Sequence, residues 1–117
     1  MIDVPPDRFD ELVGEALDGI PEELARLVDN VAVVVEDGAD DGPLFGRYEG
    51  VPLTERNHWY GRGGMTMPDQ VTIFRLPICA ACDSEDQVVE EVRITVVHEI
   101  AHHFGIDDER LEALGWA

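Results

Sequence analysis

The chain has no lysine, so its eight basic residues are all arginine, and they stand against 26 aspartates and glutamates. The resulting formal net charge of -18 would repel the phosphates of nucleic acids and the headgroups of anionic membranes. No apolar run approaches the length of about 20 residues that a membrane-spanning helix needs. We therefore expect neither nucleic acid nor a membrane among its partners.

Cysteine is also scarce, because Cys79 and Cys82 are the only two and form a C-x-x-C pair. They exclude a zinc site made of four cysteines within one chain, and no thioredoxin-like Trp or Pro accompanies them. Residues 1–7 lack the basic and apolar segments of a signal peptide, so we expect a cytoplasmic protein with reduced thiols. A reversible disulfide or a metal role for the pair stays open.

A length of 117 residues suits one domain, 1–117, with a single hydrophobic core. Apolar residues recur at helical spacing over 9–17, and 21–28 predicts a second short helix. The β-branched run 31–36 predicts a strand buried on both faces, and the alternation over 70–76 predicts another strand. For 44–56, periodicity alone predicts only turns around the glycines.

A long helix is expected from Ser84, a favourable N-cap residue, to Phe104. Its many valines are poor helix formers, so tertiary packing must hold it. Gly105 can end the helix because a residue without a Cβ adopts a left-handed conformation cheaply. The predicted buried stripe comprises Val88, Val89, Val92, Val96 and Ile100.

The end of this helix carries the strongest chemical signal, since His98 and His102 lie four positions apart. On a helix their side chains share one face, roughly 6 Å apart along the axis, and two such imidazoles can bind one metal ion. Glu99 lies about 100° around the helix from His98, near enough to hydrogen-bond a water on that metal. This spacing predicts a zinc hydrolase with Glu99 as general base.

A third ligand is expected after the chain reverses at Gly105. Asp108, ten residues after His98, has the favoured spacing for a tetrahedral Zn²⁺ site whose fourth position is water. Asp107, Glu109 and Glu112 lie within reach as alternatives on the last turn or on a short helix predicted over 107–115. His103 is expected to be a surface or supporting group.

The run H-E-x-x-H-x-x-G-x-x-D over 98–108 resembles the zinc-binding motif of zincin metallopeptidases. It is similar to the metzincin pattern with aspartate in place of the third histidine, a replacement that snapalysin-type bacterial proteases share. The sequence departs from the metzincins because no methionine follows the motif. The Met-turn that lies beneath the metzincin site is therefore absent.

A second run, G-x-Y-x-G-x-P-L-T-x-R over 46–56, resembles a family of small bacterial zincin-like metallopeptidases with a minimal version of the fold. The resemblance implies an α+β protein, with a small mixed sheet packed against N-terminal helices and a long active-site helix. It also implies that 70–76 is the sheet edge to which a substrate adds. Tyr48 is interpreted as a structural aromatic in a turn, with donation to an oxyanion as the alternative.

Together these features predict a zinc-dependent metallopeptidase that acts on a peptide or protein substrate. The alternative from another class is a non-enzymatic, zinc-stabilised module that binds a partner protein. A structural zinc site would close all four positions with protein ligands and would need no base such as Glu99. His58, the remaining histidine, is interpreted as a solvated loop residue, with a role in substrate binding as the alternative.

Overall fold

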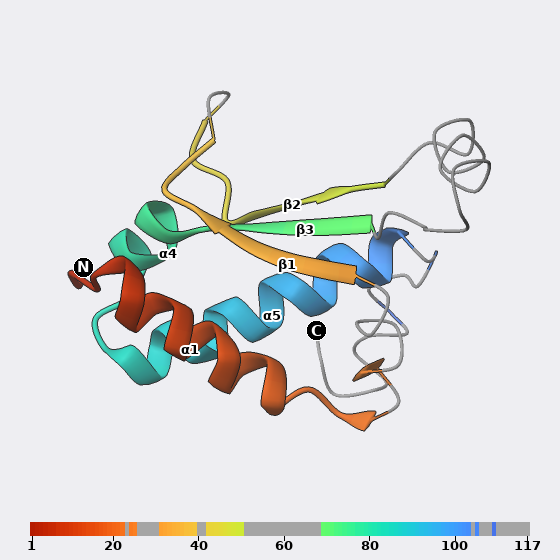
Figure 1. Ribbon diagram of the computed structural model, residues 1–117, viewed down its shortest axis with the longest axis horizontal. Coiled ribbons are helices and arrows are strands. Elements are labelled where there is room, and N and C mark those ends of the chain that lie inside the picture. Colours follow the sequence, from red (N-terminus) through yellow and green to blue (C-terminus); the bar gives the residue numbers. More distant parts are fainter. Residues whose placement is uncertain are drawn as a thin grey trace, which may run out of the picture.

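The computed structural model describes residues 1–22, 24–25, 31–39, 42–50, 69–103, 105 and 109. Its elements, in chain order, are α1 (Pro6–Asp18), β1 (Val31–Glu36), β2 (Gly46–Glu49), β3 (Asp69–Phe74), α4 (Arg75–Ala81) and α5 (Glu85–His103). Helices α1 and α5 pack against each other beneath one face of the sheet, which gives two layers (Figure 1). The predicted α+β class is confirmed.

The sheet of the described residues has the strand order β1-β3-β2. Strand β1 runs parallel to β3, with Val31 opposite Asp69, and β2 runs antiparallel to β3, with Tyr48 opposite Val71. The sheet is therefore mixed, as predicted. The prediction that residues 70–76 form its edge is wrong, because β3 is the central strand and both of its sides are already paired.

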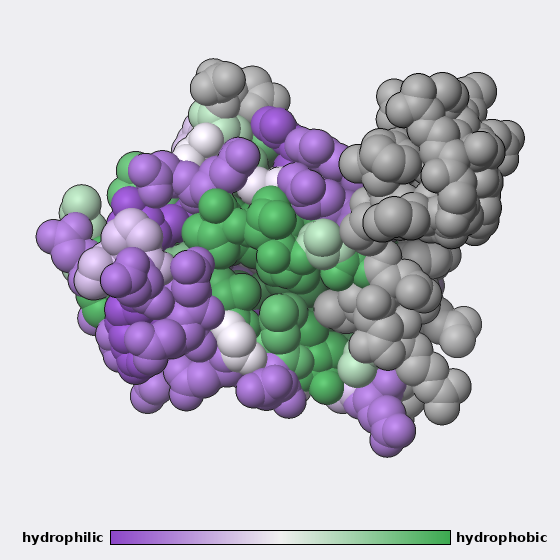
Figure 2. All heavy atoms as spheres, viewed as in Figure 1, coloured by the Kyte–Doolittle hydropathy of each residue, from purple (hydrophilic) through white to green (hydrophobic). Residues whose placement is uncertain are grey.

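The central strand of this sheet is more deeply buried than β1. The residues of β3 from Val71 to Phe74 are all buried, whereas those of β1 from Val31 to Val35 are only half-buried. The predicted bounds of β1 are confirmed, but its expected burial on both faces is wrong, because none of its residues is fully buried. In the sheet that the described residues form, β1 is an outer strand. Its valines contribute to apolar surface over β1 and between β1 and α1, with hydrophilic residues around it (Figure 2).

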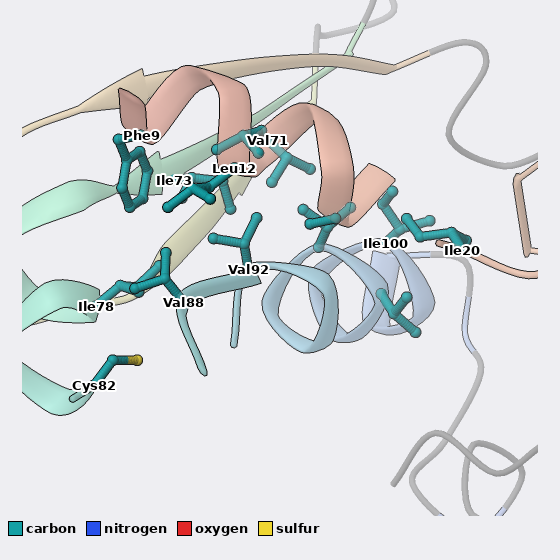
Figure 3. Close-up of a cluster of buried hydrophobic side chains, with 14 of the residues drawn as sticks. Phe9, Leu12, Ile20, Val71, Ile73, Ile78, Cys82, Val88, Val92 and Ile100 are labelled. Carbon is teal, nitrogen blue, oxygen red and sulfur yellow. The ribbon is translucent and has the colours of Figure 1, made fainter. Parts of the chain in front are cut away.

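The core lies between the sheet and the helices. Figure 3 shows side chains of α1, β3, α4 and α5 meeting there, among them Phe9, Val71, Ile78 and Val92. The predicted stripes of both long helices are confirmed, except that Leu17 and Val89 are only partly buried. The buried residues of these helices are Phe9, Leu12, Val13 and Ala16 in α1 and Val88, Val92, Thr95, Val96, Val97, Ile100 and Ala101 in α5.

The first turn of α5 is fixed by a cap and by an ion pair. Ser84 Oγ accepts a hydrogen bond from the Gln87 N–H at 3.2 Å, which confirms Ser84 as the N-cap. Glu85 receives two hydrogen bonds from Arg8 of α1, from Nε at 3.1 Å and from Nη2 at 2.8 Å. Both helices are thereby joined at this end, far along α5 from His98.

Two elements were not predicted from the sequence. Strand β3 ends at Phe74 and the chain enters α4, in which Pro77 occupies the first turn, where its missing N–H is not needed. Arg75 secures this turn by donating to the Val4 carbonyl at 2.8 Å and to Asp37 Oδ1 at 2.9 Å. Strand β2 replaces the predicted turns over 46–49.

Cys79 and Cys82 are free thiols, and both are buried. Burial raises the pKa of each thiol above its ordinary value, which lowers the fraction of reactive thiolate. Cys79 lies in α4 and accepts, through its carbonyl, a hydrogen bond from the Ile2 N–H at 3.0 Å. The pair therefore contributes to the core.

Several predictions fall wholly or partly outside the described residues. They include the loop around His58, the part of the run 46–56 that follows Gly50, and the final helix over 107–115 apart from Glu109. Of the helix predicted over 21–28, the described part shows helical hydrogen bonds from the Leu24 and Ala25 N–H groups to the Pro21 carbonyl. Among the helices of the described ranges, none has the length and apolarity needed to cross a bilayer.

Candidate metal centre

The last two turns of α5 carry the histidines that the sequence singled out. Val97, Ile100 and Ala101 turn toward the core, so the intervening positions face away from it. His98 and Glu99 are half-buried and His102 is exposed. The helix therefore buries its apolar stripe while leaving both imidazoles accessible at the end of α5 that lies next to the start of β3 (Figure 1).

The structure brings the two predicted metal-binding rings together. The ring centroids of His98 and His102 lie 6.0 Å apart, with the planes tilted by 52°. In a tetrahedral site with Zn–N distances of about 2.0 to 2.1 Å, two imidazole centroids lie about 5 to 5.5 Å apart. The observed separation is within about 1 Å of that value, a difference that small side-chain rotations can supply. The separation of the two rings therefore suits two ligands of one zinc ion.

Gly105 behaves as predicted. Its φ of +75° is in the left-handed region, and its N–H donates to the His102 carbonyl at 3.2 Å. A side chain at this position would strain the backbone, which is why glycine suits the end of α5. The helix ends at His103, one residue after His102, and Gly105 lies two positions beyond that end.

The predicted third ligand cannot be placed in the same way. Asp108 and its alternatives Asp107 and Glu112 lie outside the described residues, and Glu109 is exposed. Within the described part of the chain, no three His, Cys, Asp or Glu side chains form a group able to hold a metal ion. The assignment of Asp108 stays a prediction.

A second cluster lies beside this end of α5, and the sequence did not reveal it as a unit. The ring of Tyr48, from β2, stacks on that of His103, the last residue of α5, with centroids 3.9 Å apart and planes 15° from parallel. The Tyr48 hydroxyl donates to Asp69 Oδ2, on β3, at 2.7 Å. We call Tyr48, Asp69 and His103 the sheet–helix clamp.

The clamp decides between the two interpretations of Tyr48. A hydroxyl has one hydrogen to donate, and that of Tyr48 is directed at the Asp69 carboxylate. Donation to an oxyanion would require this charge-assisted bond to break. The arrangement favours a structural role for Tyr48, although in a strand and not in a turn.

Asp69 has no signal in the sequence that sets it apart from the other acids. Its role appears only when β2, β3 and α5 come together, since its partners are 21 and 34 positions away along the chain. Only 11% of the Asp69 side chain is exposed, although this acid lies at the first position of its strand. The Tyr48 hydroxyl and His103 Nε2, at 2.7 and 3.6 Å from Asp69 Oδ2, are among its neighbours.

A comparison with protein families decides the class. A family model described as zincin-like metallopeptidase matches residues 28–116. The chain belongs to this family. The match includes the whole sheet, α4, α5 and the residues after Gly105, so it extends well beyond the two histidines.

Membership indicates a zinc-dependent peptidase in general terms, and the α+β architecture agrees with a minimal zincin-like fold. The predicted resemblance is therefore confirmed. No curated protein matches the sequence. The family match does not identify the ligands or the base, so His98, Glu99, His102 and Asp108 remain predictions from spacing and geometry.

Proposed function

We propose that this zincin-like protein hydrolyses peptide bonds, with His98, His102 and Asp108 as zinc ligands and Glu99 as general base. The observation that carries the proposal is the pair of imidazoles one turn apart on α5, with ring centroids 6.0 Å apart. Glu99 follows the first of them on the same accessible end of the helix. Family membership independently supports zinc and peptide chemistry.

Each residue of the proposed site has a distinct task. Zinc, when bound, supplies a Lewis acid that acidifies water and polarises a peptide carbonyl. Glu99 accepts a proton from the attacking water and delivers it to the departing amine. As ligands, the imidazoles of His98 and His102 would not reduce the positive charge of the zinc ion. The Asp108 carboxylate would reduce the net charge of the site by one, which a third histidine would not, and would make the zinc a weaker Lewis acid. We therefore expect modest turnover.

The substrate is proposed to be a peptide or protein segment in extended form. Because β3 is central, the strand edge available near α5 belongs to β2, which contacts α5. No other strand of the described residues pairs with the outer side of β2. An extended peptide can add there through main-chain hydrogen bonds. This edge replaces the one predicted at residues 70–76.

The test compares wild-type protein with Glu99→Gln on a peptide library, after zinc loading and metal analysis. Loss of the base should lower kcat by about 10²- to 10⁴-fold while zinc content stays at the wild-type level. Glu90→Gln is the matched control, since it is the same substitution on the same helix at a position exposed to solvent. It should leave turnover unchanged.

Two results would oppose the proposal in different ways. Unchanged turnover in Glu99→Gln would reject Glu99 as base while leaving a zinc peptidase possible. A wild-type protein that binds zinc tightly yet cleaves no library peptide would instead favour the zinc-stabilised interaction module, in which the metal has a structural role only.

A further inference from the structure

The sheet–helix clamp joins three elements at the C-terminal end of α5. Tyr48 comes from β2, Asp69 from the first position of β3, and His103 is the last residue of α5. The Tyr48 hydroxyl bonds Asp69 Oδ2 at 2.7 Å while the Tyr48 ring stacks on His103 at 3.9 Å. Tyr48 is therefore the link between the sheet carboxylate and the helix end.

Such a link can stabilise the end of α5. The last turn of a helix lacks the hydrogen-bond partners of its final carbonyls and tends to fray. Here the following residue within the described part is Gly105, in a left-handed conformation that permits but does not enforce the helix end. The stacking of Tyr48 on His103 is a contact from outside the helix that can hold this turn in one orientation.

The clamp acts at the residue that follows His102. Successive helical residues differ by about 100° around the axis, so fixing the direction of the His103 ring fixes the direction in which His102 projects. His103 Nε2 lies 3.6 Å from Asp69 Oδ2, which is too long for a good hydrogen bond. The stacking on Tyr48, with ring centroids 3.9 Å apart, is the closer of these two contacts of the His103 ring.

Both contacts are strong enough to matter. A stacked aromatic pair contributes beyond its buried area, and a hydrogen bond to a charged group is stronger than one between neutral groups. Asp69 is only 11% exposed, so water screens its bond with Tyr48 weakly.

We infer that Tyr48, Asp69 and His103 are positioning residues that hold the last turn of α5 against the sheet and thereby orient His102 for zinc. The inference rests on the proposed function, because it assumes that His102 is a ligand. None of the three residues needs to touch the metal. Groups that orient a ligand typically change metal affinity by about 10- to 100-fold when removed.

The opposite end of α5 offers a matched control. Arg8 makes two hydrogen bonds to Glu85 there, so it also joins the helix to a neighbouring element. Arg8→Ala releases the first turn of α5, whereas Tyr48→Ala releases the last. If the clamp merely stabilised the fold, the Kd of Zn²⁺ would be the same for Tyr48→Ala as for Arg8→Ala at temperatures where both variants are folded.

The experiment measures the Kd of Zn²⁺ by competition with a chromophoric chelator, for folded protein. Tyr48→Ala should raise the Kd about 10-fold, Tyr48→Phe less because stacking remains, and Arg8→Ala not at all. Asp69→Ala should behave like Tyr48→Ala. Asp69→Asn keeps an acceptor for the Tyr48 hydroxyl and should recover much of the affinity.

Amide hydrogen exchange provides a readout that does not depend on zinc. In Tyr48→Ala the amides of residues 100–103 should exchange faster than in wild type, while those of residues 92–96 keep their protection. If Tyr48→Ala does not fold, Tyr48→Phe, which loses the bond to Asp69, carries the same two measurements with a smaller expected change.

The outcomes separate this inference from the proposed function. Wild-type zinc affinity in Tyr48→Ala, or an equal loss in Arg8→Ala, would overturn the positioning role and leave the zinc site standing. A wild-type protein that binds no zinc would reject the proposed function and, with it, the inference. Weaker zinc binding in the clamp variants alone supports both.

Discussion

Gly46, at the start of β2, lies close to α5, the helix that carries the candidate metal ligands. A Cβ at this position would lie 2.6 Å from Thr95 Cγ2, on α5, and 3.2 Å from the Thr72 carbonyl oxygen, on β3. Carbon atoms in favourable contact lie about 3.5 to 4.0 Å apart. Gly46→Ala must therefore push β2 and α5 apart by about 1 Å.

The expected cost follows from these distances. Overpacking of this kind destabilises by about 1 to 3 kcal/mol, and the reduced freedom of alanine in the unfolded chain offsets about 0.5 to 1 kcal/mol. The net loss is about 1 to 2 kcal/mol. For a domain of this length we expect Tm to fall by roughly 4 to 8 °C.

The assay is thermal unfolding of four proteins, which form a double-mutant cycle. Thr95→Ser removes the clashing methyl group but keeps the hydroxyl that donates to the Glu91 carbonyl at 2.8 Å. Adding it to Gly46→Ala should restore at least half of the lost stability. Gly14→Ala is the control, because nothing lies within 4 Å of a Cβ there and alanine favours the helix.

Three results would refute the reasoning. Gly46→Ala with a Tm at or above that of wild type would show that no close contact exists. Failure of Thr95→Ser to restore stability would place the clash elsewhere. Gly14→Ala should raise Tm slightly, and an equal fall in both alanine variants would mean that the loss does not come from overpacking.

Two further predictions concern the third ligand and the first turn of α5. Asp108→Ala should weaken zinc binding by about 10-fold or more in a chelator competition, whereas Asp107→Ala should change it little, and the reverse order would transfer the ligand role to Asp107. Hydrogen bonding to Arg8 holds the pKa of Glu85 below its ordinary 4.5, so the stability from this pair is present above that value and lost as pH falls through the folded pKa. Glu85→Gln should therefore lower stability to urea at pH 7 and flatten its decline below pH 4.5, and identical pH profiles for the two proteins would contradict the pairing.

The elements that the sequence predicted well are those with strong local signals. The apolar spacing of α1, the valine run of β1 and the Ser84 cap of α5 each depend on residues within one or two turns of one another. Their bounds could therefore be predicted from local sequence, without knowledge of tertiary contacts. The position of Gly105 after the histidine motif belongs to the same class.

The elements that were missed depend on distant partners. Strand β2 has a glycine at its start and forms because β3 and α5 are close enough to receive it. Helix α4 begins at Arg75, within the strand predicted over 70–76, and Pro77 occupies its first turn. The residues of β2 do not by themselves distinguish a strand from turns, and those at the start of α4 do not distinguish a helix from the end of a strand.

The same difference applies to the candidate site. The spacing of His98 and His102 predicted their pairing, because both lie on one helix and its geometry is regular. The clamp could not be predicted, since Tyr48, Asp69 and His103 come from three elements. The strand order, which is the reason that we propose β2 and not β3 as the substrate edge, is likewise a property of the whole sheet.

The most direct test of the central claim is a calorimetric titration of Zn²⁺ into wild-type protein and into single histidine variants. We predict one zinc per chain for wild type and for His58→Ala, and a loss of at least about 100-fold in affinity for His98→Ala and for His102→Ala. Wild-type affinity in either His98→Ala or His102→Ala would contradict the account, because it would show that zinc is held without the paired imidazoles of α5.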